Sequence, residues 1–417
     1  MPDNQFDDRY RLPAHHVDNP GVQKRARFVE DEQRRMQSEI RTRPGNIAWF
    51  EDLLAKPVAE EGRKLVGYFC NMIPPEMIRA LGALPVRLGC GNPAMVQPGE
   101  EVFSGEICPL AKASFAAFMD EGSAANRCDA LLVPTSCDAK RKLGEVLADF
   151  KPTFMLNLPP EQDARRFGRF AQEEFSRMAD FLCGELGARL KQGELCRQIE
   201  LFNRRALLAR ELQEKRAAKP ASVSIRDLLA VIQSSFVAVD LEKWLLEAEK
   251  VRAHIDAFDA SRPRYRPRLV LTGAPIIWPN FKPLNLIEES GADVVADTLC
   301  SGVQAVFDPV VYAEKSRGAL LRALAERYVF GSPCPCFISQ ATRLSRVLDL
   351  VREFRADGVI NYSLRLCQLF DIEAYRLSRI MREKNVPFMI MRTDYSLEDT
   401  EQLRVRLEAF LETIDDD

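Results

Sequence analysis

The stretch "DALLVPTSCDAKRKLGEVL" (129–147) joins an apolar run to a short polar turn and then to a segment rich in helix-forming residues. The apolar run predicts a buried β-strand, and the residues after Cys137 predict a helix. A second stretch, "DGVINYSLRLCQLFDIEAYR" (357–376), repeats this arrangement around Cys367. Because Ser, Thr, Asp and Asn are the usual residues at a helix N-terminus, a cysteine at both junctions needs a chemical reason.

Strands and helices alternate on both sides of these two stretches, which is typical of a parallel sheet covered by helices. Three strands of the first block have counterparts in the second: 64–70 with 268–274, 129–135 with 357–363, and 151–159 with 386–394. Between the two blocks, apolar residues recur at helical spacing. We therefore predict an α/β fold of two similar Rossmann-like or flavodoxin-like domains with parallel sheets, plus a helical insert and N-terminal helices.

The same pattern sets the expected domain boundaries. We expect an N-terminal arm and helices at 1–60, a first α/β domain at 61–160, a helical segment at 161–262 and a second α/β domain at 263–417. A chain of 417 residues is long enough for two domains that each have a core.

Composition excludes several classes of function. The formal net charge of −3 gives no electrostatic basis for binding nucleic acid. No apolar run approaches the roughly 18 residues of a membrane span, and the N-terminus lacks the apolar centre of a secretory signal. No G-x-x-x-x-G-K-[S/T] loop for ATP is present either. We expect a cytoplasmic protein that binds neither membrane nor nucleic acid.

The cysteines carry the strongest functional signal. The chain has 11 cysteines and only 3 histidines, so a His-based triad or a His-rich zinc site is not expected. Ligands of open α/β sheets bind beyond the carboxyl ends of the strands. Seven cysteines are expected at strand ends or in loops, namely Cys70, Cys108, Cys137, Cys300, Cys334, Cys336 and Cys367. Dispersed cysteines without a C-x-x-C pair favour an iron–sulfur cluster over zinc.

A helix N-terminus stabilises a thiolate, because its N–H groups and dipole present positive charge. The cysteines that precede the two predicted helices are therefore placed to be thiolates that face a cleft. The other four cysteines are expected to be small buried apolar residues: Cys90, Cys128, Cys183 and Cys196.

Several motifs in order resemble the 2-hydroxyacyl-CoA dehydratase and benzoyl-CoA reductase family. They are "GYFCNMIPPEMIRALGALPVRL" (67–88), "EICPLAKASF" (106–115), "VPTSCDAKRKLGEVL" (133–147) and "LCQLFDIEAYRLSRIMREKNVPFMIMRTDYS" (366–396). The resemblance extends over about residues 60–415. Within that family, the cysteine set and "TSCDAKRKL" are most similar to the double-cubane cluster proteins, which are anaerobic reductases. The resemblance implies two flavodoxin-like domains with the cluster between them.

The resemblance also implies which cysteines bind the cluster. Cys108, Cys137 and Cys367 match the three positions that hold a single 4Fe–4S cubane in the dehydratases. Three further cysteines, Cys70, Cys300 and Cys334, would then hold a second cubane. Cys336 is an alternative to Cys334, and the "PCPC" loop leaves that choice open. The resemblance further implies a homodimer and a separate ATP-hydrolysing iron–sulfur activator protein as electron donor.

Other polar residues allow more than one interpretation. Glu373 follows Cys367 by six residues, so we expect it as a candidate catalytic proton donor. Its spacing from Arg376 also fits an ordinary ion pair on one helix face. The basic run at 140–142 is expected to be a solvated helix face, and the alternative is a patch for an acidic partner or an anionic substrate.

Three hypotheses for function result. The first is an activator-dependent, low-potential reductase of small substrates at a double-cubane cluster. The second is a 2-hydroxyacyl-CoA dehydratase subunit with a single 4Fe–4S cluster, which is a lyase that removes water by radical chemistry. The third is an iron–sulfur or zinc protein with a structural or chaperone role, which predicts no redox activity.

Overall fold

The computed structural model describes residues 43–55, 62–120, 122–259, 266–338 and 341–415, together with Lys24, Arg27, Phe28, Asp31 and Arg35. Most of the N-terminal arm and helices predicted at 1–60 lies outside the described residues.

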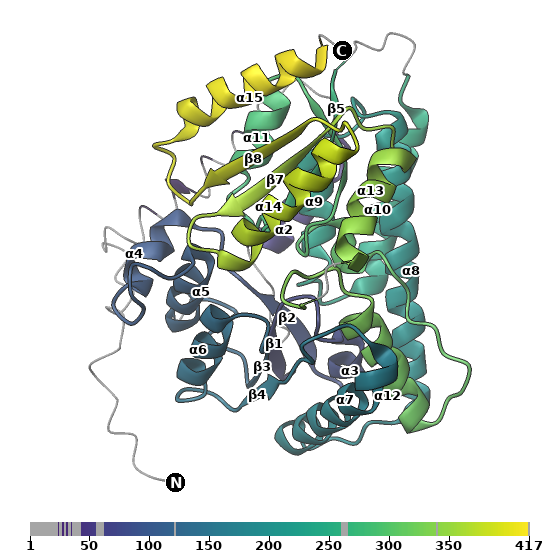
Figure 1. The fold of residues 1–417 in the computed structure, drawn as a ribbon. Helices are drawn as coiled ribbons and strands as arrows, with labels where there is room; N and C mark the ends of the chain where they lie inside the picture. Colours follow the sequence, from purple (N-terminus) through teal and green to yellow (C-terminus); the bar gives the residue numbers. More distant parts are fainter. Residues whose placement is uncertain are drawn as a thin grey trace.

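The first α/β unit is built on a parallel sheet of four strands (Figure 1). The strands lie in the order β2-β1-β3-β4, with bounds β1 (Leu65–Phe69), β2 (Leu84–Leu88), β3 (Ala130–Pro134) and β4 (Thr153–Leu156). The helical elements are α3 (Pro75–Ala80), η1 (Pro93–Met95), α4 (Val96–Gly99), α5 (Pro109–Met119) and α6 (Asp138–Leu147). Strands β1 and β3 are buried throughout, as apolar central strands covered on both faces should be.

The second unit has the same topology. Its parallel strands lie in the order β6-β5-β7-β8, with bounds β5 (Arg268–Gly273), β6 (Asp293–Asp297), β7 (Gly358–Leu364) and β8 (Phe388–Thr393). Its helical elements are α11 (Lys282–Glu289), η2 (Val303–Val306), α12 (Arg317–Ala325), η3 (Glu326–Phe330), α13 (Ala341–Glu353), α14 (Gln368–Glu383) and α15 (Thr400–Asp415). The equal strand orders confirm the predicted pairing of strands between two similar α/β units.

A layer of long helices joins the two units. It consists of α7 (Ala164–Leu186), α8 (Gln192–Ala218), α9 (Ile225–Ser234) and α10 (Leu241–Ala257), and α2 (Ile47–Ala55) packs on α9. Helix α8 contacts α3 of the first unit as well as β6 and η2 of the second, and it runs along one side of the molecule (Figure 1). Helix α12 packs on α7, and its Leu324 shares a core with Val66 of β1 and Phe175 of α7. The units are therefore fixed against one another by shared apolar packing.

The predicted fold class is confirmed, whereas the domain boundaries stay a prediction. Among the described residues, no helix is both long enough and apolar enough to cross a membrane.

Candidate iron–sulfur site

One cavity of about 500 Å³ lies where the two α/β units meet. Residues that follow six of the described strands, β1, β2, β3, β5, β6 and β7, line it. All seven cysteines expected at strand ends and loops are among them: Cys70, Cys108, Cys137, Cys300, Cys334, Cys336 and Cys367. The carboxyl-end position of this cavity agrees with the general location of ligand sites in open α/β sheets.

Three of these cysteines are the N-cap residues of helices. Cys108 precedes α5, Cys137 precedes α6 and Cys367 precedes α14. None of the three thiols has the geometry of a full capping hydrogen bond, although first-turn N–H groups lie close enough to each sulfur to favour a lower pKa. At the N-cap position, each cysteine therefore directs its sulfur into the cavity and contributes less to the stability of its helix.

Cys108 and Cys367 come from different units and their thiols contact each other. A hydrogen bond from the Cys367 thiol lowers the pKa of Cys108, with the N–H groups of Leu110 and Ala111 adding to the effect against burial. The same contact, together with burial, raises the pKa of Cys367. Within this pair, Cys108 is therefore the stronger acid and Cys367 the weaker one.

Two cations face the other side of the cavity. Burial would raise the pKa of Cys70, but the charges of Lys140 and Arg87 lower it overall. Burial would lower the pKa of Lys140, but the facing thiolates, led by Cys70, raise it. Cys70 is buried and has a left-handed backbone with φ of 69°. Such a conformation is uncommon for a residue other than glycine and is often found at functional sites.

Three further cysteines of the cavity are weaker acids than a free thiol. Burial and the charge of Cys70 raise the pKa of Cys300 to about 11. The thiol of Cys336 and burial raise the pKa of Cys334, and burial also raises the pKa of Cys137. Cys334 and Cys336 both line the cavity, so both stay available as ligands.

Arg87 connects the first unit to the second at this cavity. It lies on β2, and its Nη2 donates a hydrogen bond to the carbonyl oxygen of Cys300. Its guanidinium also lies over the ring of Phe236, 4.5 Å from the centroid. Arg87 was not among the site residues expected from the sequence, and a charged residue within the apolar strand "LPVRL" was its only signal.

Glu373 does not line the cavity. It is fully buried on α14 and forms an ion pair with Arg343, whose Nε lies 2.5 Å from Glu373 Oε1. Burial raises the pKa of Glu373, and the Arg343 charge opposes that rise. The local pair expected with Arg376 is therefore replaced by a partner from α13. Its role as proton donor stays a prediction.

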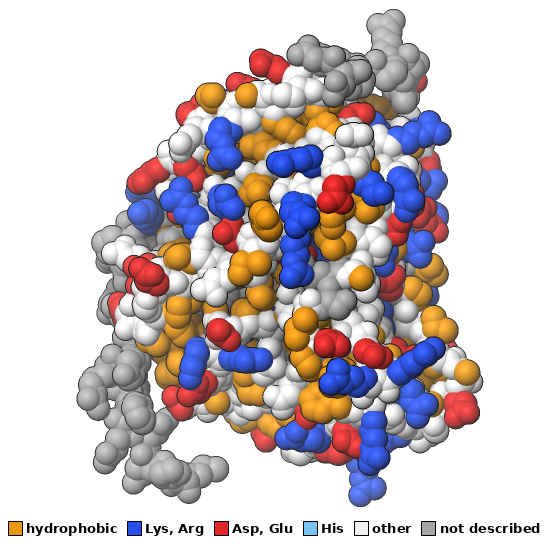
Figure 2. All heavy atoms as spheres, viewed as in Figure 1, with side chains coloured by type: hydrophobic (Ala, Val, Ile, Leu, Met, Phe, Trp, Pro, Cys, Tyr) orange, Lys and Arg blue, Asp and Glu red, His pale blue; other side chains and the backbone are white. Residues whose placement is uncertain are grey.

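The basic run at 140–142 is divided between two environments. Lys140 is partly buried among the cysteines of the cavity, which differs from the solvated face expected for it. Arg141 and Lys142 lie at the cavity rim and pair with Asp138 and Glu145. Figure 2 shows that charged side chains of both signs are interspersed over the viewed face, so this face has no field of a single sign.

The thiols that line the cavity come from both α/β units. In the described part of the chain, no three His, Cys, Asp or Glu side chains are grouped as ligands of one metal ion. The thiols instead surround a cavity, and an iron–sulfur cluster is a body of several atoms that cysteine thiolates bind from around it. Nearby cations, such as Arg87 and Lys140, offset the negative charge of such a ligand set.

Four cysteines do not line this cavity: Cys90, Cys128, Cys183 and Cys196. Cys128 is fully buried beside β1, and burial raises its pKa to about 12. Cys196 is buried on α8 in the core of the first unit. Cys128 and Cys196 match the buried apolar role expected for them, whereas Cys90 and Cys183 are only partly buried against the cores.

Comparison with known proteins gives consistent matches over most of the chain. A protein of Escherichia coli (strain K12), provisionally named dehydratase subunit YjiM, is 28% identical over 368 residues, which cover 87% of this chain and 94% of that protein. The beta subunit of (R)-2-hydroxyglutaryl-CoA dehydratase from Acidaminococcus fermentans is 21% identical over 87% of this chain and 95% of its own length. One of the benzoyl-CoA reductase subunits of Thauera aromatica is 21% identical over 85% of this chain and 92% of its own length.

The family model for the D-component of 2-hydroxyglutaryl-CoA dehydratase matches residues 70–414. That span includes all seven cysteines of the cavity. The relatives are named as subunits of dehydratases and of a reductase, which agrees with the resemblance found in the motifs. The chain belongs to the family of the 2-hydroxyglutaryl-CoA dehydratase D-component.

Proposed function

We propose that the chain is a subunit of a low-potential reductase that acts on small substrates at a double-cubane iron–sulfur cluster. The observation that supports this most is that seven cysteines line one cavity and give six ligand positions, three from each α/β unit, with Cys334 and Cys336 as alternatives for one of them. A single 4Fe–4S cluster in this family needs three of them, so three more would be unexplained. When bound, the cluster would supply electrons of low potential to the substrate.

We assign the ligands in two sets. The first set is Cys108, Cys137 and Cys367, and the second set is Cys70, Cys300 and Cys334, with Cys336 as the alternative to Cys334. Thiolates are the form that binds iron, and the lowered pKa values of Cys70 and Cys108 give each set one sulfur that ionises readily.

Other residues of the cavity would control what reaches the cluster. Apolar side chains, including Leu364, Leu366 and Phe370, line part of the wall and would limit access of water. Arg87 and Lys140 would offset the negative charge of the thiolates. The cavity volume of about 500 Å³ leaves space only for a small molecule beside a cluster.

The partners follow from the same proposal. The chain contains no P-loop, so the ATP-dependent step would belong to a separate iron–sulfur activator protein. The chain itself would act as a homodimer, without a second kind of catalytic subunit.

The test is to measure iron and acid-labile sulfide per chain after strictly anaerobic purification, with EPR spectra of the reduced protein. We expect about eight irons per chain, since two cubanes contain four each. A chain that holds no iron after reconstitution would return the cysteines to a structural role and end the proposal.

A second candidate is a subunit of a 2-hydroxyacyl-CoA dehydratase with one 4Fe–4S cluster. The specific observation in its favour is that Cys108, Cys137 and Cys367 form a distinct set, since each precedes a helix. This candidate predicts about four irons per chain and dependence on another subunit. It also predicts that replacing Cys300 leaves the iron content unchanged.

A further inference from the structure

Arg343 is a buried cation at the wall of the cavity. It lies near the start of α13, its side chain is 2% exposed, and it lines the cavity beside the cysteines. A buried guanidinium is costly unless its N–H groups have partners. The partners of Arg343 therefore indicate which parts of the chain it holds in place.

One nitrogen of the guanidinium reaches the segment of Cys334, and a second is linked to the segment of Cys300 through a pair of threonines. Nη1 donates a hydrogen bond of 3.0 Å to the carbonyl oxygen of Pro333, the residue before Cys334. Nη2 donates a bond of 2.8 Å to the hydroxyl of Thr272 at the end of β5. That hydroxyl also accepts a bond of 2.6 Å from Thr298, which lies two residues before Cys300.

The third nitrogen reaches the segment of another cysteine. Nε pairs with Glu373, and the guanidinium carbon lies 5.2 Å from the centroid of the Phe370 ring. Both partners are on α14, whose N-cap residue is Cys367. One planar side chain thus contacts the segments of Cys334 and Cys367 directly and is linked to the segment of Cys300 through Thr272.

We propose that Arg343, held by Glu373, is a positioning residue that sets the spacing of the Cys300, Cys334 and Cys367 thiols around the cavity. The inference rests on the proposed function, because the spacing matters for a cluster that these thiols bind. It assigns Glu373 a role through Arg343, since the carboxylate contacts the guanidinium and does not line the cavity.

The geometry of the guanidinium, and not its charge alone, carries this role. Lysine keeps the positive charge but has no planar group that can donate to Pro333 and Thr272 from two fixed nitrogens while a third nitrogen faces Glu373. We therefore expect Arg343→Lys to fold and yet to hold the thiols at the wrong spacing.

The first readout needs no cluster. Phenylarsine oxide binds covalently to two neighbouring thiols, so its affinity for the iron-free full-length chain reports thiol spacing. We expect Arg343→Lys to weaken this binding about 10- to 100-fold, which is typical when a residue that orients metal ligands is replaced. The second readout is the iron content and the EPR spectrum after anaerobic reconstitution, and both should be altered.

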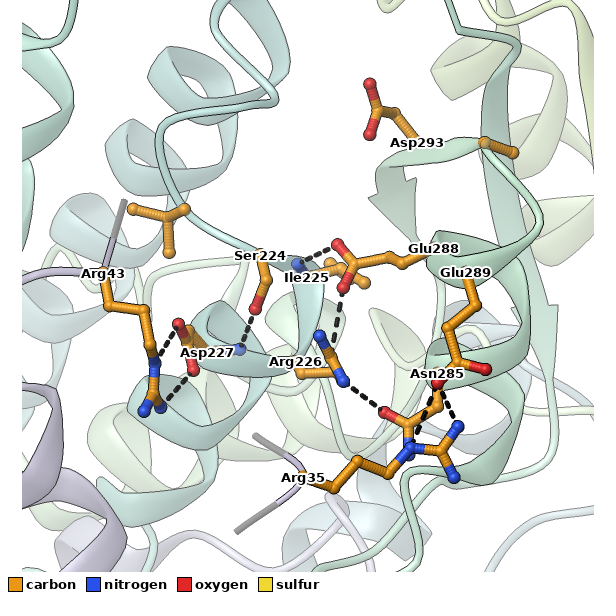
Figure 3. A network of polar contacts seen from close by, with 12 residues as sticks. Arg35, Arg43, Ser224, Ile225, Arg226, Asp227, Asn285, Glu288, Glu289 and Asp293 are labelled. Atoms are coloured by element: carbon orange, nitrogen blue, oxygen red, sulfur yellow. Dashed lines mark hydrogen bonds and ion pairs between the residues drawn. The ribbon is translucent and has the colours of Figure 1, made fainter. Parts of the chain in front are cut away.

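Arg226 provides a matched control. It is a buried arginine on α9 whose Nε lies 3.1 Å from a carboxylate oxygen of Glu288, and whose Nη1 donates to Asn285 at 2.9 Å (Figure 3). It does not line the cavity. Arg226→Lys should lower the melting temperature by a similar amount and leave the arsenical affinity and the iron content as in the wild type.

A double variant separates positioning from simple stability. Arg343→Leu/Glu373→Leu removes both buried charges together, which often restores the stability that is lost when one partner is removed alone. We expect it to melt near the wild-type temperature while its arsenical affinity stays low.

Several outcomes would overturn the inference. One is wild-type arsenical affinity in Arg343→Lys, and another is an equal loss in Arg343→Lys and Arg226→Lys that follows their melting temperatures. A wild-type chain that binds no iron would reject the proposed function alone. The arsenical comparison would still decide whether Arg343 positions the thiols.

Discussion

The two sets of cysteines are held in the same cavity by different means. Cys108, Cys137 and Cys367 each begin a helix, so the main chain of that helix fixes their positions. Cys300 and Cys334 lie in loops, and Cys70 lies at a strand end in a left-handed conformation. A cysteine at the start of a helix is positioned by local structure. The cysteines of the second set are positioned by side chains that contact their loops.

Each α/β unit supplies three of the six cysteines. The first unit supplies Cys70, Cys108 and Cys137, and the second supplies Cys300, Cys334 and Cys367. The two proposed ligand sets cross this division, because each takes members from both units. The cavity therefore needs both units in place, which the shared packing of α7, α8 and α12 provides.

The largest effect expected from this comparison is on iron content. Cys300→Ala should reduce iron by about half, since it removes a ligand of the second set and leaves the helix-bound set intact. Iron analysis and EPR after anaerobic reconstitution would measure this. Cys183→Ala is the matched control, because Cys183 lies on α7 and does not line the cavity. Unchanged iron in Cys300→Ala would favour the single-cluster dehydratase.

Asp297 shows how a side chain shapes one loop of the second set. Its carboxylate accepts hydrogen bonds from the N–H groups of Leu299 (2.9 Å) and Val303 (3.3 Å), on either side of Cys300. Gly302 is required there, because a Cβ atom at that position would lie 2.2 Å from Asp297 Oδ1. Burial raises the pKa of Asp297 to about 6, against the effect of the N–H groups.

This pKa predicts a difference in the pH dependence of stability. The folded-state pKa lies above the unfolded value, so the folded state binds this proton more tightly. The free energy of unfolding that protonated Asp297 contributes is fully present below about pH 4 and is lost as the pH rises through about 6. Relative to Asp297→Asn, the wild type should lose up to about 3 kcal/mol of unfolding free energy over this range.

Urea unfolding of the iron-free wild type and of Asp297→Asn at several pH values would measure the difference. Taking the difference between the two proteins removes the contribution of the other titrating groups. If the two stability curves run parallel from pH 4 to pH 7, Asp297 is not the group that titrates.

The sequence predicts the first set more fully than the second for a physical reason. An apolar strand followed by a helix is a local pattern, so the placement of Cys137 and Cys367 at equivalent junctions could be read directly. The left-handed backbone of Cys70 has no such signal, because glycine or asparagine usually occupies that conformation. The contacts of the loop cysteines join segments that are distant in the chain.

The pairing of Glu373 illustrates the same limit. Its spacing from Arg376 predicts a local pair, but the fold places Glu373 on the buried face of α14 and leaves Arg376 exposed. A buried carboxylate needs a buried cation, and Arg343 supplies one from 30 residues earlier in the chain. In the sequence, Arg343 resembles any other arginine of an amphipathic helix.

The smallest effect concerns the cations that face the second set. Arg87 and Lys140 are the positive charges that act most strongly on Cys70 and Cys300. Lys140 also acts on Cys137, whereas backbone N–H groups act on Cys108. A cluster gains negative charge when it is reduced, so a nearby cation favours the reduced state. Arg87→Met should therefore make reduction about tenfold less favourable, which is a shift of about 59 mV toward negative potential for one electron.

An EPR-monitored redox titration of the reconstituted protein would measure that shift. Arg87→Lys should keep most of the wild-type potential, because it keeps the charge. Arg210→Met is the control, since Arg210 also lies over an aromatic ring, 4.6 Å from the centroid of Phe307, but does not line the cavity. If Arg87→Met and Arg210→Met both titrate at the wild-type potential, charge at β2 does not tune the second set. The two sets of cysteines would then differ only in the structural elements that position them, which are helix starts for the first set and loops or a strand end for the second.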